Sequence, residues 1–339
     1  MKICIIGCGG HASQVHGPAQ RKYAKLHPDT VLSACCDLDI HRALDYKERF
    51  GFQNACDNAL EMLDRENPDA VCIVVPTAAT AQVAIPVLKR GIPVFLEKPP
   101  GSSCAELENL IAAAETGDGR QQVAFNRRHM PVLRQAVEIL DSQMPPDSVF
   151  RIDYEMIRND RRDTDFSTTA VHVIDAALYL ARSPFRRAKI DYRALDQIGP
   201  GVAGIEMRME CESGTEVALN IQPVGGQNSE RIHIHACGSS LLIEFPVMGL
   251  RGPGASLCLW RDDLKIISSS PDDHAEDLMG FYAQTEHFFD SIRANRPLRP
   301  TLSECHQQVE LMEAVRERVG AIDWAPNQAC QKRTFLQFA

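Results

Sequence analysis

The stretch KICIIGCGGHA, Lys2 to Ala12, joins a short apolar run to a glycine-rich turn. Residues 2–6 predict a buried β-strand, and the pattern after Ala12 predicts a helix that ends near Lys25. Gly7, Gly9 and Ala12 fit the GxGxxG/A spacing, in which the first glycine permits a tight turn and the second lets the backbone approach a pyrophosphate. The amino terminus of the helix that follows stabilises the phosphate charge. The turn therefore predicts a dinucleotide site at Gly7, Gly9, Gly10, His11 and Ala12.

A carboxylate stands at the end of the second expected strand, TVLSACCD, Thr30 to Asp37. Asp37 follows Ala12 by 25 residues, close to the spacing at which an acidic residue accepts hydrogen bonds from the ribose hydroxyls of a dinucleotide. Its charge would repel a 2′-phosphate, and the next residue is Leu38 rather than an arginine. NAD is therefore the expected cofactor, with NADP as the alternative.

Strands and helices alternate along the first third of the chain. Uninterrupted apolar strands that alternate with helices indicate a parallel sheet covered on both faces. The expected fold class for residues 1–126 is thus α/β, a Rossmann-type doubly wound sheet, which binds its ligand beyond the carboxyl ends of its strands. Pro76, Thr77 and Asn126 stand at such ends and are candidate cofactor contacts. The further expected strands are 69–76, 92–96 and 121–126, and the further expected helices are 40–50, 80–90 and 104–116.

The segment FLEKPPG, Phe95 to Gly101, places Glu97 and Lys98 directly after the fourth strand. Lys98 is therefore expected at the ligand edge of the sheet, where Pro99 restricts it to an extended backbone and permits a cis peptide. An ammonium held there can donate a hydrogen bond to a substrate hydroxyl and stabilise the alkoxide that forms as hydride leaves. A loop lysine paired with Glu97 is the alternative interpretation.

The composition is that of a two-domain globular protein. The 339 residues exceed one ordinary hydrophobic core, and the 44% apolar and 24% charged content excludes a disordered or fibrous chain. A formal charge of −9 argues against a partner that is nucleic acid or an acidic membrane. No apolar run approaches the roughly 20 residues that span a bilayer, and the opening MKICIIG is already a strand, which leaves no room for a signal peptide.

The twelve cysteines are scattered without a CxxC motif, so free thiols in a reducing cytoplasm are expected.

After Asn126 the pattern changes to that of an α+β domain, residues 127–339. A largely antiparallel open sheet is expected, together with helices at 131–140 and 168–181. On the second helix Thr168, His172 and Asp175 share one face, and a neutral imidazole there is a suitable general base for an alcohol proton. A core histidine capped by Asp175 is the alternative. The expected strands are 149–156, 188–195, 202–211, 216–222, 231–236, 241–245 and 257–260, with a hairpin turn at 213–214.

Motifs along nearly the whole chain resemble one enzyme family. They resemble motifs of the glucose–fructose oxidoreductase, inositol dehydrogenase and MocA family. The motifs are GCGGHA, DAVCIVVPT, GIPVFLEKP, VAFNRRHMP, FSTTAVHVIDAALYL, IHIHACGSSLLIEF and the segment that starts GFYAQTEHFF. The resemblance implies that Lys98 and His172 flank the nicotinamide and carry the chemistry, and that the chain forms a homo-oligomer, a dimer or a tetramer. Two positions depart from the family pattern, because Thr168 and Thr80 stand where an aspartate and a histidine are usual.

Other polar groups are weaker candidates. RNDRRDTDF, Arg158 to Phe166, has no net charge and suits a solvated loop. Because this segment leads into the His172 helix, an arginine such as Arg158 is also a candidate to grip a substrate carboxylate or phosphate. His233 and His235 share a strand face, yet no further ligands are visible near them, so no metal site is expected. The candidate substrate-binding residues are Lys98, Asn126, Arg158, Thr168 and His172.

Three functions are compatible with these residues. The first is NAD(P)-dependent oxidoreduction, in which hydride passes between the nicotinamide and a hydroxyl-bearing carbon of a sugar, polyol or related small molecule. In this reaction Lys98 orients the hydroxyl and His172 exchanges its proton. The second, motivated by Thr168, is a redox-neutral lyase or glycosidase-like reaction with tightly bound NAD. The third, motivated by Thr80 and Thr168, is a non-catalytic nucleotide sensor that retains the fold.

Overall fold

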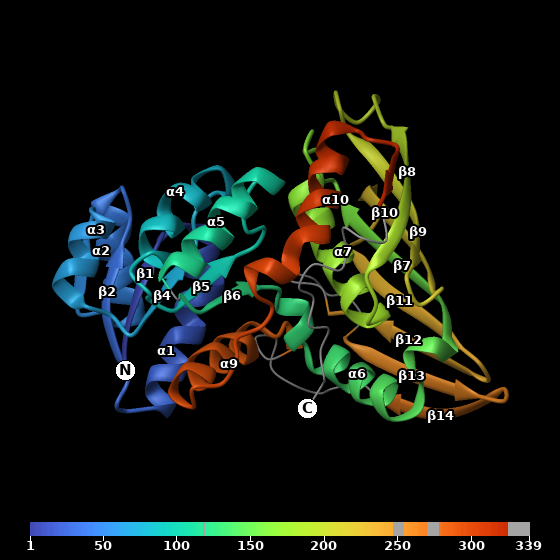
Figure 1. Ribbon diagram of the computed structural model, residues 1–339, viewed down its shortest axis with the longest axis horizontal. Coiled ribbons are helices and arrows are strands. Elements are labelled where there is room, and N and C mark those ends of the chain that lie inside the picture. Colours follow the sequence, from blue (N-terminus) through green and yellow to red (C-terminus); the bar gives the residue numbers. More distant parts are fainter. Residues whose placement is uncertain (118, 247–253, 270–277, 325–339) are drawn as a thin grey trace. The chain divides into compact units, whose positions relative to one another are not determined.

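A computed structural model of the chain describes residues 1–117, 119–246, 254–269 and 278–324 (Figure 1). The amino-terminal part holds a six-stranded sheet in the order β3-β2-β1-β4-β5-β6, in which all neighbouring strands are parallel. This order confirms the expected Rossmann-type sheet. Its strands are β1 (Lys2–Ile6), β2 (Val31–Cys36), β3 (Asn54–Cys56), β4 (Ala70–Ile73), β5 (Val94–Glu97) and β6 (Gln121–Ala124).

Two helices of this sheet, α2 and α3, begin after residues whose side chains bind free backbone N–H groups. The Asp39 side chain accepts a hydrogen bond from His41 N–H at the start of α2, and the Asn58 side chain caps α3 in the same way. Neither β3 nor α3 was expected, because three and eight residues are too short to show a period in the sequence. The helices are α1 (Gly17–Leu26), α2 (Ile40–Phe50), α3 (Ala59–Glu66), α4 (Thr77–Leu88) and α5 (Cys104–Gly117), with a π-helix η1 (Ala12–His16) before α1 and a 3₁₀ turn η2 (Asn126–His129) after β6.

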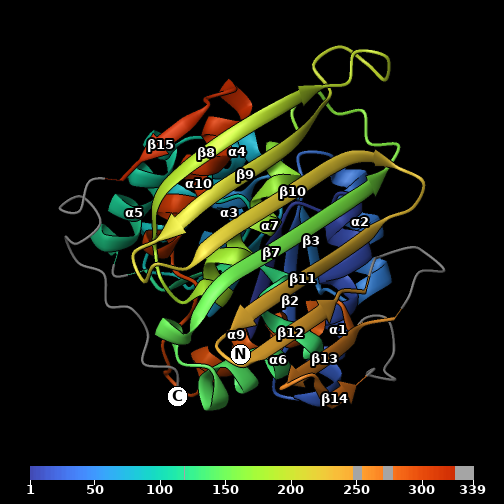
Figure 2. The ribbon, with the colours of Figure 1, turned by 90° about the vertical axis from the view of Figure 1, so that its right-hand side faces the viewer.

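A nine-stranded sheet follows, in the order β14-β13-β12-β11-β7-β10-β9-β8-β15 (Figure 2). All of its neighbouring strands are antiparallel except β7 and β10, which are parallel. The expected largely antiparallel sheet is therefore confirmed, although the edge strands β14 and β15 were not expected. The strands are β7 (Val149–Asn159), β8 (Phe185–Ala194), β9 (Ala203–Cys211), β10 (Glu216–Gly225), β11 (Ser229–Ala236), β12 (Ser239–Glu244), β13 (Ser256–Arg261), β14 (Leu264–Ser269) and β15 (Ala321–Asp323).

One face of the nine-stranded sheet carries the core, and the other is polar. Along β7, Ile152, Tyr154 and Met156 are buried, whereas Asp153 and Glu155 between them are partly exposed. The buried face packs against α6 (Pro131–Gln143), α7 (Ser167–Ala181) and α10 (His306–Glu317). This alternation is the pattern of a sheet that is covered on one side only. Among the described residues, no helix combines the length and the apolar character needed to cross a membrane.

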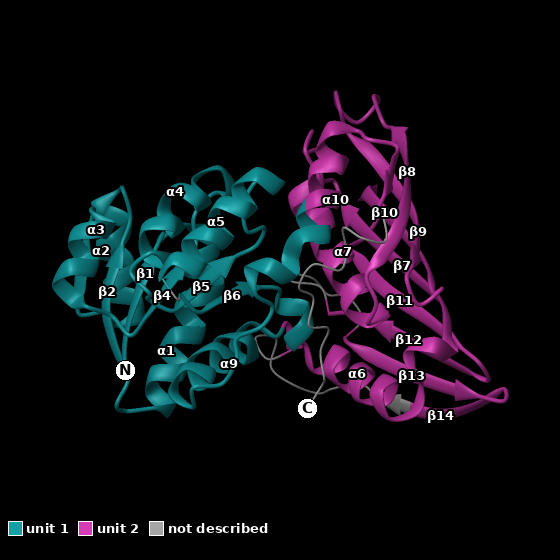
Figure 3. Ribbon diagram, viewed as in Figure 1, with its two compact units in different colours: residues 1–129, 280–309 teal, residues 130–279, 310–339 magenta. Residues whose placement is uncertain are grey.

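The chain divides into two compact units (Figure 3). Unit 1 comprises Met1–His129 and Gly280–Val309, and unit 2 comprises Met130–Met279 and Glu310–Ala339. The first boundary lies three residues beyond the expected one, but the segment Gly280–Val309, expected in the second domain, belongs to unit 1. It does so because α9 (Phe281–Arg293) packs against α1. This contact buries Phe288 and Phe289 of α9, and the Tyr23 hydroxyl donates a hydrogen bond of 2.7 Å to Asp290.

Candidate active site

The parallel sheet of unit 1 brings the expected cofactor residues to one edge. The glycine turn follows β1, Asp37 follows β2, Thr77 begins α4 after β4, and Lys98 follows β5. Carboxyl ends of parallel strands lie at the same edge, which is the ligand-binding edge of an open α/β sheet. The residues that share this edge are Gly7, Gly9, Gly10, His11, Ala12, Asp37, Pro76, Thr77, Glu97, Lys98 and Asn126.

The glycines of the turn have two different environments. Gly7 has a φ of +97°, and a Cβ placed on it would lie 2.0 Å from the carbonyl oxygen of Val74. Only glycine fits there, because the neighbouring strand passes so closely. A Cβ on Gly9 or Gly10 would meet no heavy atom within 4 Å. The turn is thus tightly packed at its first glycine and open at the next two, which fits the close approach of a pyrophosphate.

Asp37 is attached directly to the glycine turn. Its Oδ2 accepts a hydrogen bond of 2.8 Å from the backbone N–H of Cys8, and its Oδ1 accepts one of 3.0 Å from Asp39 N–H. These bonds fix the carboxylate while its remaining lone pairs stay available as acceptors. Leu38 beside it is 96% exposed, so an apolar side chain stands where a cation would have to neutralise a 2′-phosphate.

Glu97 joins the start of the first helix to the end of β5. His16 Nε2 lies 2.8 Å and His11 Nε2 3.2 Å from Glu97 Oε1, while Glu97 Oε2 accepts a hydrogen bond of 3.0 Å from Lys98 N–H. Burial alone would raise the pKa of the Glu97 carboxyl, but the hydrogen bonds from the two histidines outweigh it and hold the pKa well below its ordinary value. The sequence indicated Glu97 and His11 only as single cofactor contacts and missed His16. A spacing of five residues does not place two side chains on one face of an α-helix.

The expected catalytic residues lie in different units. Lys98 is half-buried in unit 1, and its peptide bond to Pro99 is cis. His172 is half-buried on α7 in unit 2, as is Thr168 one turn before it, whereas Asp175 is completely buried. Thr80, the other position that departs from the family pattern, is buried on α4.

The Arg158 side chain forms an ion pair within unit 2. Its guanidinium binds the Glu230 carboxylate, which also accepts a hydrogen bond from the Tyr154 hydroxyl. The side chains of Arg158 and Glu230 are 12% and 3% exposed, so this is a buried ion pair. Removing one partner of such a pair leaves a buried charge unsatisfied, and this geometry favours a structural role for Arg158 over the expected grip on a substrate anion. Arg161 and Arg162 pair with Asp163 and Asp160 in the same segment.

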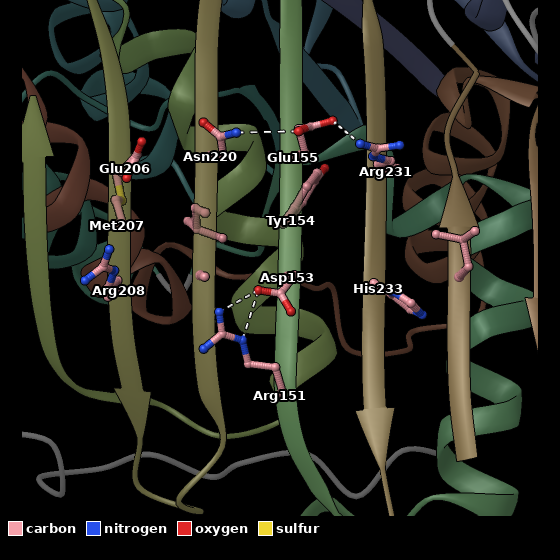
Figure 4. Close-up of a pocket in the computed structure, with 13 residues that line it drawn as sticks. Arg151, Asp153, Tyr154, Glu155, Glu206, Met207, Arg208, Asn220, Arg231 and His233 are labelled. Carbon is pink, nitrogen blue, oxygen red and sulfur yellow. Dashed lines mark hydrogen bonds and ion pairs between the residues drawn. The ribbon is translucent and has the colours of Figure 1, made fainter. Parts of the chain in front are cut away.

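The polar face of the nine-stranded sheet contains a shallow hollow of about 600 Å³ (Figure 4). Figure 4 shows that its charged side chains pair with one another, Arg151 with Asp153 along β7 at 2.7 Å and Arg231 of β11 with Glu155 of β7 at 2.9 Å. Because these side chains alternate along β7 with the buried ones, the hollow lies on the face opposite to α7 and His172. The hollow therefore contains none of the expected catalytic or cofactor-binding residues.

A comparison with known families identifies the amino-terminal part of the chain. Residues 1–125 match GFO_IDH_MocA, described as an oxidoreductase family with an NAD-binding Rossmann fold. Residues 1–125 belong to the Gfo/Idh/MocA family. The match covers the glycine turn, Asp37 and the EKP segment, and it confirms the family resemblance expected from those motifs.

Curated relatives and a solved structure resemble the chain to different extents. Oxidoreductase P35 of Formosa agariphila is 31% identical over 140 residues, which are 41% of this chain and 42% of the relative. Myo-inositol 2-dehydrogenase of Thermotoga maritima is 28% identical over 141 residues, which are 41% of each chain. The chain therefore spans about two-fifths of the length of these curated relatives. The structure of levoglucosan dehydrogenase in complex with NADH and L-sorbose superposes on 95% of this chain and 98% of its own with a TM-score of 0.78, at 16% identity, so the same fold extends over nearly the whole chain.

Proposed function

We propose that this chain is an NAD(P)-dependent oxidoreductase that acts on a hydroxyl-bearing carbon of a sugar, polyol or related compound. The observation that carries the proposal is the bond between Asp37 and the glycine turn, beside two glycines with open space above them. This arrangement suits a dinucleotide whose ribose hydroxyls bind the Asp37 carboxylate and whose pyrophosphate contacts the glycine backbone. The similarity to a myo-inositol 2-dehydrogenase supports a polyol or sugar as the class of substrate.

The cofactor-binding role is proposed for residues at the carboxyl edge of the sheet of unit 1. Gly9, Gly10 and the helical turn that starts at Gly10 offer backbone N–H groups to the pyrophosphate. Asp37 accepts the ribose hydroxyls, and the exposed Leu38 next to it supports NAD over NADP. Bound NAD supplies the hydride acceptor for alcohol oxidation or, when reduced, the hydride donor for carbonyl reduction.

Lys98 and His172 are proposed as the catalytic pair. The Lys98 ammonium donates a hydrogen bond to the substrate oxygen and stabilises the negative charge that develops on it. The His172 imidazole accepts the hydroxyl proton during oxidation and returns it during reduction. Thr168 can hydrogen-bond the imidazole or the substrate, but unlike an aspartate it cannot stabilise the imidazolium by charge.

A substrate screen with a cofactor readout tests the proposed function. The purified chain is incubated with NAD or NADP and a panel of sugars and polyols, and formation of the reduced cofactor is followed by absorbance while products are analysed in parallel. Stoichiometric NADH formation with at least one substrate is the expected result. Product without net NADH would replace the proposal with redox-neutral chemistry, and NAD binding without any turnover across the panel would replace it with a nucleotide sensor.

A homo-oligomer is proposed as the working assembly. The polar face of the nine-stranded sheet presents cross-strand ion pairs, and Leu264 and Ile266 on the edge strand β14 are 67% and 52% exposed. Exposed apolar side chains at a sheet edge favour association. Light scattering on the intact chain should give a multiple of the monomer mass, and a monomer at micromolar concentration would refute the assembly.

The cytoplasm is the proposed compartment. All eleven cysteines within the described residues are free thiols, which agrees with a reducing environment. Fractionation of cells that express the chain, with thiol labelling of the recovered protein, tests the assignment. Recovery from an oxidising compartment, or with oxidised cysteines, would contradict it.

A further inference from the structure

Three metal-binding side chains meet at one point of unit 1, although their positions in the sequence are far apart. His11 Nε2, His16 Nε2 and a Glu97 carboxylate oxygen all lie within 4.8 Å of one another. Glu97 comes from the end of β5, and the two histidines come from the start of the first helix. Two imidazoles and a carboxylate are a donor set that Zn²⁺ uses in proteins.

A π-helical turn is the reason that His11 and His16 face the same carboxylate. In an α-helix, residues five apart point in different directions, because one turn takes 3.6 residues. Residues Ala12–His16 are π-helical, and Gly17 N–H donates to the Ala12 carbonyl five residues before it. The wider turn brings the two imidazole centroids to 5.5 Å from each other. Such π-turns occur frequently at functional sites.

Neighbouring groups hold each of the three side chains in place. The His16 ring lies edge-on to Phe95 at 5.7 Å, and the His11 ring lies edge-on to Phe281 at 6.3 Å. The second carboxylate oxygen of Glu97 is held by Lys98 N–H. Outer contacts of this kind orient metal ligands and strengthen metal binding.

Exposure differs among the three in a way that suits an ion with one open position. The side chains of His16 and Glu97 are 1% and 10% exposed, whereas that of His11 is 43% exposed. An ion held by all three would therefore be enclosed on the side of His16 and open to water on the side of His11. Three protein ligands plus water is the usual coordination of a zinc site that keeps one exchangeable position.

We propose that His11, His16 and Glu97 form a binding site for a divalent transition-metal ion, with Zn²⁺ as the best fit. Tetrahedral zinc with bonds of about 2.1 Å needs donor atoms about 3.4 Å apart. The two histidine nitrogens now lie 2.8 and 3.2 Å from Glu97 Oε1, so they would move from this oxygen by about 0.6 and 0.2 Å when the ion binds. Imidazole donors favour Zn²⁺ over Mg²⁺ or Ca²⁺. Without metal the Nε2–H groups donate hydrogen bonds to the carboxylate. When an ion binds through Nε2, each neutral imidazole carries its proton on Nδ1 instead.

Metal binding to the intact chain tests this site independently of the proposed oxidoreductase function. The chain is stripped with a chelator, titrated with Zn²⁺ by calorimetry, and analysed for metal after dialysis. We expect one tightly bound ion per chain, and we expect His11→Gln and His16→Gln to weaken its binding at least about 100-fold. His41→Gln, a change of an exposed histidine on α2, is the matched control and should leave the affinity unchanged.

Two further measurements distinguish metal bound at this site from metal bound by other side chains of the chain. Substitution with Co²⁺ should give a spectrum without sulfur-to-cobalt charge transfer, because the proposed donors are nitrogen and oxygen while the cysteines would supply sulfur. His11→Gln alters a partly exposed side chain, so circular dichroism should show an intact fold even if the buried His16→Gln variant unfolds. Thiolate bands in the cobalt spectrum, or unchanged zinc affinity in a folded His11→Gln variant, would overturn the proposal.

Discussion

The carboxylate of Asp37 accepts a hydrogen bond of 2.8 Å from the backbone N–H of Cys8, 29 residues earlier in the chain. This bond joins the end of β2 to the glycine turn after β1. The two strands are neighbours in the sheet, and Gly7 N–H also donates a hydrogen bond of 2.8 Å to the Cys36 carbonyl. The proposed ribose and pyrophosphate contacts are therefore fixed relative to each other before a cofactor binds, which reduces the entropy lost on binding.

Replacement of Asp37 should weaken NAD binding and reduce the preference for NAD over NADP. A hydrogen bond to a charged acceptor contributes about 1.5–3 kcal/mol, so Asp37→Ala should raise the Kd for NAD roughly 10- to 100-fold. Fluorescence titration with both cofactors measures the change. Asp45→Ala, which removes an exposed carboxylate on α2, should bind both cofactors like the parent. An unchanged ratio of the two affinities in Asp37→Ala would contradict the ribose contact.

The first two glycines of the turn should respond differently to alanine. Gly7→Ala forces a Cβ to within 2.0 Å of a carbonyl oxygen at a positive φ, and it should lower the free energy of unfolding by at least about 2 kcal/mol. Gly9→Ala meets no atom within 4 Å, so its stability should stay close to that of the parent while its NAD affinity falls. Urea unfolding combined with cofactor titration separates these effects. Tight NAD binding by Gly9→Ala would argue against backbone contact with the pyrophosphate.

Lys98→Met should remove turnover and leave cofactor binding nearly intact. The substitution keeps most of the side-chain volume but removes the ammonium that stabilises the developing alkoxide, so kcat should fall by about two to three orders of magnitude. Lys89→Met, at the exposed end of α4, is the matched control. Steady-state kinetics and NAD titration of both variants provide the measurements. Parent-like turnover of Lys98→Met would refute the assigned role.

His172 and Thr168 should act together on the pH dependence of turnover. His172→Asn should lower kcat by about 10²- to 10⁴-fold if the imidazole is the general base. Thr168→Asp places a carboxylate four residues before the histidine on α7, which favours the protonated imidazole. The acidic limb of the pH–rate profile for alcohol oxidation should then move to higher pH, since the base must be neutral to accept a proton. A pH profile identical to that of the parent would place Thr168 away from the base.

Glu66 should make the stability of unit 1 depend on pH in the acidic range, below the unfolded pKa of a glutamate, about 4.3. Its carboxylate accepts hydrogen bonds from Ser33 at 2.6 Å and from Arg65 at 2.8 Å. Burial raises the pKa of Glu66, but these two partners outweigh burial, and the pKa lies below its ordinary value. A carboxyl with a lowered folded pKa stabilises the fold above its unfolded pKa of about 4.3, and this contribution is lost as the pH falls below that value.

The comparison of Glu66→Gln with the parent tests this pH dependence. At pH 7 the variant should be less stable by about 1 kcal/mol, because a neutral hydrogen bond replaces a charged one. The difference should stay constant down to the unfolded pKa of about 4.3 and shrink as the pH falls below it. Glu61→Gln changes an exposed residue of the same helix and should show no such trend in urea unfolding. A difference that is constant with pH would mean that the lost stability is not due to ionisation of Glu66.

Local patterns accounted for most elements of both sheets. Short apolar runs bounded by turn residues predicted β1, β2, β4, β5 and β6, because strands covered on both faces have almost no polar positions. Strand-like runs after Asn126 likewise predicted β7 to β13 of the second sheet. Elements below about eight residues, such as β3 and β15, escaped because so few residues define no period.

The assignment of residues to units was outside the reach of local pattern. Gly280–Val309 follows the second sheet in sequence but belongs to unit 1. Arg293 of α9 binds the Asp29 carboxylate at 2.6 Å, and Tyr23 reaches Asp290. Such contacts join residues more than 250 positions apart, and no window along the chain contains both partners.

The sequence by itself determined which residues of unit 1 follow its parallel strands, because the alternation of strands and helices implies a parallel sheet whose strands all end at one edge. Only the tertiary structure decided how these residues contact one another. In the folded chain Asp37 accepts a hydrogen bond from Cys8 N–H, and Arg158 forms a buried ion pair with Glu230. A π-helical turn places His11 and His16 beside Glu97. The strands and their parallel direction follow from patterns that repeat along the chain, whereas contacts between individual side chains depend on backbone detail and on partners that are distant in sequence.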